Sequence, residues 1–185
     1  MREIRERPPL WDEIDAEFHV AGKSILFAFG GLIYNPEGGK ITRELVAHEA
    51  IHGQRQGPDP DQCFEWWRRY IQDKGFRLQE EIPAHQAEYK AYCKRHGFGR
   101  DKYLDFVAEK LASPLYGNLI SSAKARRIIT EPTDWKVVAG EVLHPDSQKY
   151  KDHLKNAPRL MVFDEAAEMT KAHWDAAAKF AKGKS

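Results

Sequence analysis

The segment that decides the fold is ITRELVAHEAIHGQRQG, residues 41–57. Thr42 offers a side-chain oxygen that can cap the first amides of a helix. Gly57, followed directly by a proline, is typical of the residues that end one. The sequence therefore predicts a helix over about residues 43–56.

Two histidines four residues apart bracket a glutamate in this helix, in the pattern H-E-x-x-H. His48 and His52 project from the same side, one turn apart, so both imidazoles can bind one metal ion. Glu49 lies on the adjoining side, where it can miss the ion and still contact a water molecule bound to it. This pattern on a helix is typical of a zinc site with its general base. His48 and His52 are therefore predicted metal ligands, and Glu49 is the predicted catalytic residue.

The alternative is that the motif is only the polar turn of a surface helix. For this composition, a chance H-E-x-x-H somewhere in the chain has a probability of roughly 3 in 100. The flanking residues Val46, Ala47, Ala50 and Ile51 are apolar, which indicates that the histidines are half-buried. The metal site is therefore the better interpretation.

A small β-sheet is expected before this helix, and further helices after it. Residues 18–40 are rich in β-branched and aromatic residues and contain glycine turns, so we predict two or three short strands there. Apolar periodicity predicts later helices over about 61–73, 80–96, 101–112, 118–129 and 164–182. The predicted fold class is α+β.

A catalytic zinc ion takes three protein ligands and leaves one position open. Glu81, His85 and Glu88 are spaced so that one helix would present all three on one side. Glu81 is favoured, although Pro83 would place it at the start of that helix or before a kink. Glu88 and His85 stay as alternatives. Those that do not bind the metal are expected to orient a ligand, or in the case of His85 to contact the substrate oxyanion.

These segments together resemble the gluzincin branch of the zincin metallopeptidases. Residues 24–56 are similar to the strand and the HExxH helix of that family. Residues 76–92 (FRLQEEIPAHQAEYKAY) resemble its second metal-binding helix, where a glutamate in E-x-x-A-D is the third ligand. EIPAH at 81–85 matches this pattern, with histidine where aspartate is commoner. Small metallopeptidases of phage and prophage origin are similar over about residues 18–96.

The resemblance implies a zincin-like domain over residues 1–131, with Zn²⁺ held by His48, His52 and Glu81. It also implies a peptide or protein substrate that binds in extended conformation, as an added β-strand along the edge of the sheet. The resemblance does not extend to residues 132–185, and we expect them to form a C-terminal extension that packs on the same domain.

The implied chemistry is hydrolysis of a peptide bond. The zinc ion would polarise the scissile carbonyl and lower the pKa of its bound water to about 7. Glu49 would take the proton from that water and pass it to the leaving amine. Tyr89, His85 and Tyr116 are candidates for the group that contacts the oxyanion. The alternative function is an inactive zincin-like, metal-binding protein that serves as a structural or accessory component of a phage or prophage.

Composition argues against several other classes of protein. The 185 residues carry a net charge of +1 without a block of like charge, so nucleic acid is not an expected partner. The stretch WWRRY at 66–70 could stack on bases, but its helical spacing favours a core position. Two cysteines are too few for a disulfide framework. The N-terminal residues lack the apolar region of a signal peptide, and no apolar run could span a membrane, so a cytoplasmic or virion-associated protein is expected.

Overall fold

The computed structural model describes residues 1–57 and 59–130 of the chain. Its elements are β1 Arg2–Ile4, α1 Trp11–Phe18, β2 Phe27–Phe29, β3 Leu32–Tyr34, α2 Arg43–Arg55, α3 Pro60–Gln72, α4 Lys74–Arg95, α5 Arg100–Leu111, the 3₁₀ helix η1 Pro114–Tyr116 and α6 Ser122–Thr130. A small N-terminal sheet followed by helices confirms the predicted α+β class. The extension expected at 132–185 and its helix over 164–182 lie outside the described residues.

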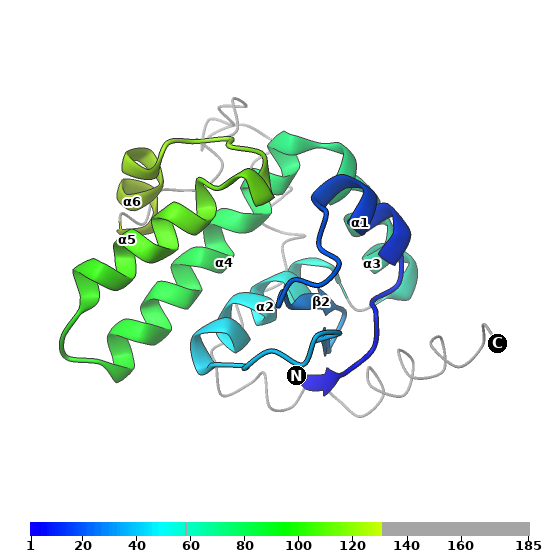
Figure 1. Cartoon of the computed structure of the whole chain (residues 1–185), viewed down its shortest axis with the longest axis horizontal. Coiled ribbons are helices and arrows are strands. Elements are labelled where there is room, and N and C mark those ends of the chain that lie inside the picture. The colour runs from blue at the N-terminus through cyan, green and yellow to red at the C-terminus, as the bar shows by residue number, and fades with distance from the viewer. Residues whose placement is uncertain (58, 131–185) are drawn as a thin grey trace, which may run out of the picture.

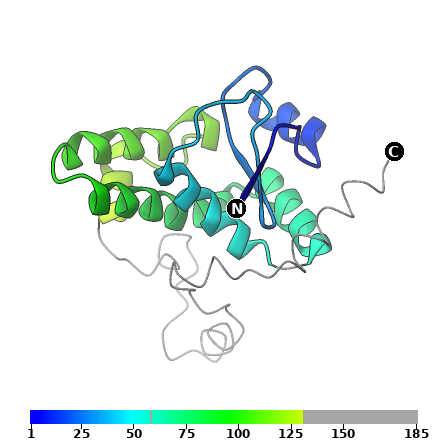
Figure 2. The same ribbon diagram turned by 90° about the horizontal axis from the view of Figure 1, so that it is seen from below.

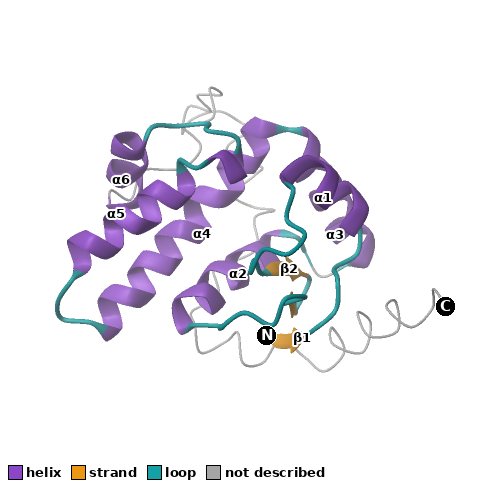
Figure 3. Ribbon diagram, viewed as in Figure 1, coloured by secondary structure: helices purple, strands orange, loops and turns teal. Residues whose placement is uncertain are grey.

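The sheet is small and mixed, with strand order β1-β3-β2. β3 pairs in parallel with β1 and antiparallel with β2, so β2 is an edge strand. Figure 3 shows the strands in orange, with β2 beside α2. β2 and β3 form the hairpin that the glycine turn at residues 30–31 predicted. Neither β1 nor α1 was predicted. A three-residue strand such as β1, which pairs with a distant segment, leaves no local pattern in the sequence.

The motif helix α2 forms as the sequence predicts. The Thr42 hydroxyl accepts a hydrogen bond from the Leu45 amide at 3.2 Å, which caps the first turn. Gly57 has a φ of 83° directly after the helix. At Gly53 a Cβ atom would lie 2.5 Å from the carbonyl oxygen of Gly30, so only glycine allows α2 to approach the hairpin this closely.

α4 begins earlier than predicted. The Asp73 side chain accepts a hydrogen bond from the Phe76 amide at 2.9 Å and caps the helix, so it starts at Lys74 rather than near residue 80. Pro83 lies inside α4 and does not end it. Glu81 therefore lies in the helix interior, and its expected place at a helix start was wrong. Packing of α4 against both α2 and α5 maintains the helix despite the amide that the proline lacks.

Two hydrophobic cores lie on either side of the α2 and α4 pair. The first core joins the sheet, α1 and α3, and its buried residues are Ile14, Val20, Phe27, Phe29, Leu32, Tyr34, Cys63, Trp66, Trp67 and Tyr70. The second core joins α4, α5 and α6, and its buried residues are Leu78, Ile82, Leu104, Val107, Ala108, Leu111, Ala125, Ile128 and Ile129. Figure 1 and Figure 2 show α1 and α3 at one end and α5 and α6 at the other. The motif histidines lie between the two cores. No described helix has the length and apolar character needed to cross a membrane.

Arg77 is the largest fully buried side chain among the described residues. Its guanidinium donates hydrogen bonds to the carbonyl oxygens of Tyr70 at 3.0 Å and Ile71 at 2.6 Å. It also pairs with Glu17 on α1 at 3.0 Å. Arg77 therefore ties α1 and the end of α3 to α4.

Replacing Arg77 with methionine is expected to lower the free energy of unfolding by about 2–4 kcal/mol. Methionine fills much of the same volume but leaves the buried Tyr70 carbonyl and the half-buried Ile71 carbonyl without this donor. Urea unfolding measures the change. The control Arg68→Met removes an exposed guanidinium from α3 and should change the free energy by less than about 0.5 kcal/mol. Equal effects of the two substitutions would contradict the structural role of Arg77.

Candidate metal centre

Three side chains from α2 and α4 converge between the two cores. His48 Nε2 lies 3.2 Å from His52 Nε2 and 3.5 Å from Glu81 Oε2. His52 Nε2 lies 3.3 Å from Glu81 Oε1. A zinc ion bound tetrahedrally at about 2.0–2.2 Å holds its ligand atoms roughly 3.3–3.6 Å apart. The two imidazole nitrogens and the two Glu81 oxygens therefore approach one another at distances close to those between the ligands of such an ion, and the group could hold a metal ion.

Some polar atoms of this region are buried without a partner. Glu81 Oε2, His52 Nδ1 and His85 Nε2 have no hydrogen-bond partner among the described residues. Leaving a buried polar atom unpaired costs about 1–3 kcal/mol, so most such atoms are paired. A cation between the three donors would supply the partner that Glu81 Oε2 lacks. The cation would not supply a partner for His52 Nδ1, because Nε2 is the nitrogen of that ring that faces His48 and Glu81.

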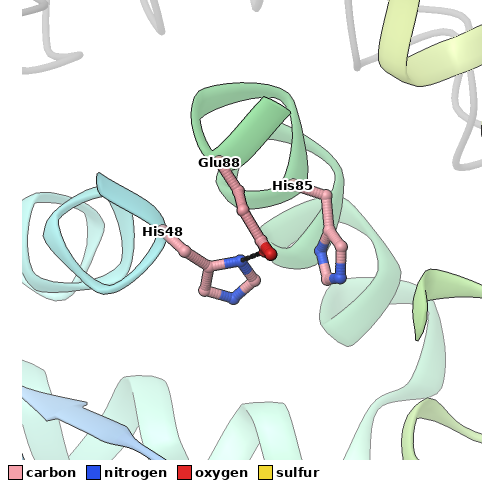
Figure 4. A group of neighbouring side chains, drawn as sticks. All are labelled: His48, His85 and Glu88. Carbon is pink, nitrogen blue, oxygen red and sulfur yellow. Dashed lines mark hydrogen bonds and ion pairs between the residues drawn. The ribbon is translucent and has the colours of Figure 1, made fainter. Parts of the chain in front are cut away.

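Glu88 contacts the other side of the His48 ring, as Figure 4 shows. Its Oε2 lies 3.0 Å from His48 Nδ1, and Lys110 Nζ lies 3.1 Å from both of its oxygens. Burial raises the pKa of Glu88, but the hydrogen bond from His48 and the charge of Lys110 outweigh it and lower the pKa to about 2. An ionised carboxylate only accepts hydrogen bonds, so Nδ1 of His48 carries the proton. Nε2 is then unprotonated and faces the other donors, as metal binding requires.

A second group that could hold a metal ion comprises His48, His85 and Glu88. Glu88 and His85 both extend from α4 toward His48 on α2 (Figure 4). The Glu88 carboxylate already contacts the Lys110 ammonium, and His85 Nδ1 lies 2.9 Å from the main-chain oxygen of Glu81. A cation in this second group would therefore have to compete with contacts that the protein already makes.

His85 is fully buried, and its ring lies edge to face against His48 and Tyr116. Its Nδ1 donates to the main-chain oxygen of Glu81 and lies 3.2 Å from Glu81 Oε2. Because Nδ1 holds the proton of the neutral ring, Nε2 is an acceptor. In this tautomer His85 steadies Glu81 and does not offer the N–H that an oxyanion would need.

The pKa values of the two motif histidines shift in opposite directions. Burial lowers the pKa of His48 to about 4. Burial also lowers the pKa of His52, but the charge and hydrogen bond of Glu81 outweigh it and raise that pKa above 6.5. The pKa of Glu81 is held well below its ordinary value by the His52 charge, in spite of burial. Without metal, Glu81 therefore favours the protonated form of His52, and a proton held there must leave before His52 can bind an ion.

Glu49 lies beside the three donors in a cavity of about 60 Å³, which is room for a few water molecules. Burial raises the pKa of Glu49 to about 7, against the opposing charge of His52 and a hydrogen bond with the main chain of Ala28. The walls are mostly apolar and come from the first core and η1: Ile14, Phe18, Val20, Ile25, Leu26, Phe27, Ala28, Trp66, Trp67, Tyr70, Leu115 and Tyr116. Water and a small reacting group could therefore meet Glu49 in surroundings of low polarity.

Two tyrosines border the cavity near Glu81. The Tyr70 hydroxyl donates a hydrogen bond to Glu81 Oε1, and Tyr116 reaches the cavity from η1. Burial and then the Glu81 charge raise the pKa of both phenols well above 10, so both remain donors. Tyr89, the other tyrosine considered from the sequence, packs against the second core and does not line the cavity. Tyr70 was not selected from the sequence, because the aromatic residues of WWRRY were assigned to the core. Tyr70 lies four residues after Trp66 and therefore on the same buried side of the helix. A tyrosine hydroxyl in such a position needs a polar partner, and this was the signal that could have identified it.

The outer edge of β2 is occupied by side chains. The Ala28 carbonyl accepts hydrogen bonds from Gln56 Nε2 at 2.9 Å and from Trp67 Nε1 at 3.0 Å. The Gly30 amide donates to Gln56 Oε1 at 2.7 Å. The carboxamide of Gln56 thus pairs with β2 much as the peptide group of a further strand would. Substrate binding along β2 stays a prediction, and it would require these side chains to release the strand.

Comparison of the chain with protein families, with curated proteins and with solved structures found no match. The gluzincin assignment therefore depends on the motifs in the sequence. The structure itself shows a buried group of histidines and glutamates that could hold a metal ion.

Proposed function

We propose that this chain is a zinc-dependent metallopeptidase of the gluzincin type. His48, His52 and Glu81 would hold Zn²⁺, and Glu49 would be the general base. The observation that carries the proposal is the approach of the two Nε2 atoms to within 3.2 Å of each other, with one Glu81 oxygen 3.5 Å from His48 and the other 3.3 Å from His52, beside a buried carboxylate in a cavity. A structural group of buried histidines would have no need of this spacing.

The side chains around the cavity have distinct parts in hydrolysis. A bound zinc ion supplies a Lewis acid that polarises the scissile carbonyl and acidifies water. Glu49 takes the proton from the attacking water and delivers it to the leaving amine, and a pKa near neutrality suits both steps. The Tyr116 hydroxyl is a protonated donor in the same cavity and can stabilise the oxyanion. The substrate is a peptide or protein segment.

Glu81 is the proposed third ligand, in preference to Glu88 and His85. Both of its oxygens face the motif histidines, and Oε2 lacks a hydrogen-bond donor. Glu88 already pairs with the Lys110 ammonium and accepts a hydrogen bond from His48 Nδ1. Glu88 and His85 therefore orient the ligands rather than bind the ion.

Metal analysis of protein purified without an affinity tag tests the proposal. We expect about one zinc ion per chain, and loss of the metal in Glu81→Gln. Glu88→Gln should retain zinc with an affinity about 10–100-fold lower. The control Glu80→Gln removes the neighbouring buried carboxylate, which pairs with Arg55 at 2.5 Å, and should retain zinc. Mass spectrometry measures the zinc content, and competition with a chelator measures the zinc affinity.

The outcomes separate the assignments. A wild-type chain that contains no zinc and takes up none would contradict the proposed function. Retention of zinc by Glu81→Gln together with its loss in Glu88→Gln would instead show that the third ligand was wrongly assigned.

A second candidate function keeps the metal and omits catalysis. Two observations favour it: the motif residues are all buried, and Gln56 and Trp67 occupy the edge of β2. The protein would then be a zincin-like accessory or structural component of a phage or prophage. Its biological function would survive the substitution Glu49→Gln.

A further inference from the structure

The Glu88 carboxylate joins the metal centre to the second core. It is 1% exposed, and a buried carboxylate is costly unless it is paired. His48 on α2 contacts one of its oxygens at 3.0 Å. On α5, the Lys110 ammonium lies 3.1 Å from both oxygens, and the Tyr103 hydroxyl donates at 3.2 Å. Three donors from two other helices therefore fix one carboxylate of α4.

We propose that Lys110 is a positioning residue of the metal centre, which acts through Glu88 to hold the His48 ring in the orientation and tautomer that zinc requires. Tyr103 assists it. This inference rests on the proposed function, because it assumes that His48 is a zinc ligand. It adds a residue of α5, a helix that contributes none of the proposed ligands.

The charge of Lys110 also decides which group of side chains takes the cation. Glu88 could itself be a ligand together with His48 and His85. The ammonium contacts both carboxylate oxygens and so occupies the place of a cation beside Glu88. Without it, the carboxylate would be free to attract the metal ion away from Glu81. Lys110 therefore keeps Glu88 as a hydrogen-bond acceptor for His48.

α5 is also held in place by apolar packing that does not involve this ammonium. Leu104, Val107, Ala108 and Leu111 hold the helix in the second core, while the Lys110 side chain is 28% exposed. Methionine at position 110 would keep the apolar part of the side chain and remove only the charge. The helix should therefore stay folded, with some loss of stability because the Glu88 carboxylate loses its cation, and the specific consequences of the substitution should appear at the metal centre.

The test compares zinc dissociation constants of the full chain, measured by competition with a chromophoric chelator. Lys110→Met should weaken zinc binding about 10–100-fold. Lys110→Arg, which keeps a cation at this position, should bind zinc within about threefold of the wild type. The matched control Lys102→Met removes an exposed ammonium from the same helix and should leave the constant unchanged. Tyr103→Phe keeps the ring stacked on Tyr92 and should weaken binding by less than Lys110→Met does.

A second measurement follows His48 directly. Nitrogen-15 NMR of the metal-free chain should show the Nδ1–H tautomer of His48 in the wild type and in Lys102→Met, and a mixture of tautomers in Lys110→Met. Lys110→Met that binds zinc as the wild type does, or equal weakening by Lys102→Met, would overturn the inference and leave the proposed function intact. A wild-type chain that binds no zinc would overturn both.

Discussion

Glu49→Gln is expected to lower kcat/KM for peptide hydrolysis by about 10²–10⁴-fold while the zinc content stays at about one ion per chain. Glutamine has the same shape as glutamate but cannot take a proton from water. The side-chain oxygen can still accept the hydrogen bond that Ala28 makes with the native carboxylate. The chain should therefore fold and bind metal normally, and only the proton transfer should be lost.

Dye-labelled casein and a mixture of quenched fluorogenic peptides serve as substrates for this measurement. The control Glu65→Gln removes an exposed carboxylate from α3 and should leave the rate unchanged. Activity in Glu49→Gln within about threefold of the wild type would show that another group is the base. Zinc binding without hydrolysis of any substrate by the wild type would instead favour the accessory, non-catalytic function.

The motif helix could be predicted from the sequence because its determinants are local. Thr42 caps it, Gly57 ends it, and the spacing of His48 and His52 follows from helical geometry alone. The convergence of Glu81 on the same point was an expectation from helical spacing and from resemblance to a family. The start of α4 was wrong because Pro83 was given more weight than the cap at Asp73.

The contacts that complete the site join residues far apart in the chain, which no local pattern reveals. His48 and Glu88 are 40 residues apart, and Lys110 lies 22 residues beyond Glu88. A lysine on an amphipathic helix is usually solvated, so the sequence offered no reason to pair Lys110 with a buried carboxylate. The same holds for Gln56, whose carboxamide binds a strand 28 residues before it.

The position of the proposed zinc site predicts a large effect of metal on stability. α2 and α4 lie between two separate cores, and His48, His52 and Glu81 would join them through one ion. An ion that is present at about 1,000 times its dissociation constant stabilises the folded state by about 4 kcal/mol. For a chain of this size, each kcal/mol raises Tm by roughly 2–4 °C. Removing zinc near pH 8 is therefore expected to lower Tm by about 8–16 °C.

This effect of zinc should decrease as the pH falls. The pKa of His52 is raised above 6.5, so below about pH 6.5 the folded chain keeps a proton on His52 that zinc must displace. The raised pKa also means that protonated His52 stabilises the metal-free fold below about pH 6.5, and that this contribution is lost as the pH rises through the folded-state pKa. The effect of His48 on the stability of the metal-free fold has the opposite sign. Its pKa is lowered to about 4, so the stability associated with neutral His48 is present above about pH 6.5 and is lost as the pH falls toward 4.

Thermal unfolding with zinc or with a chelator, from about pH 8 to about pH 5, measures the difference at each pH. We expect the difference in Tm to fall below about 2 °C near pH 5, because His52 then remains protonated in the folded chain. The variant Glu81→Gln, which lacks the proposed third ligand, should show no difference at any pH. A zinc effect that is independent of pH, or that persists in Glu81→Gln, would mean that the ion binds elsewhere, because only a site that includes His52 and Glu81 must displace this proton.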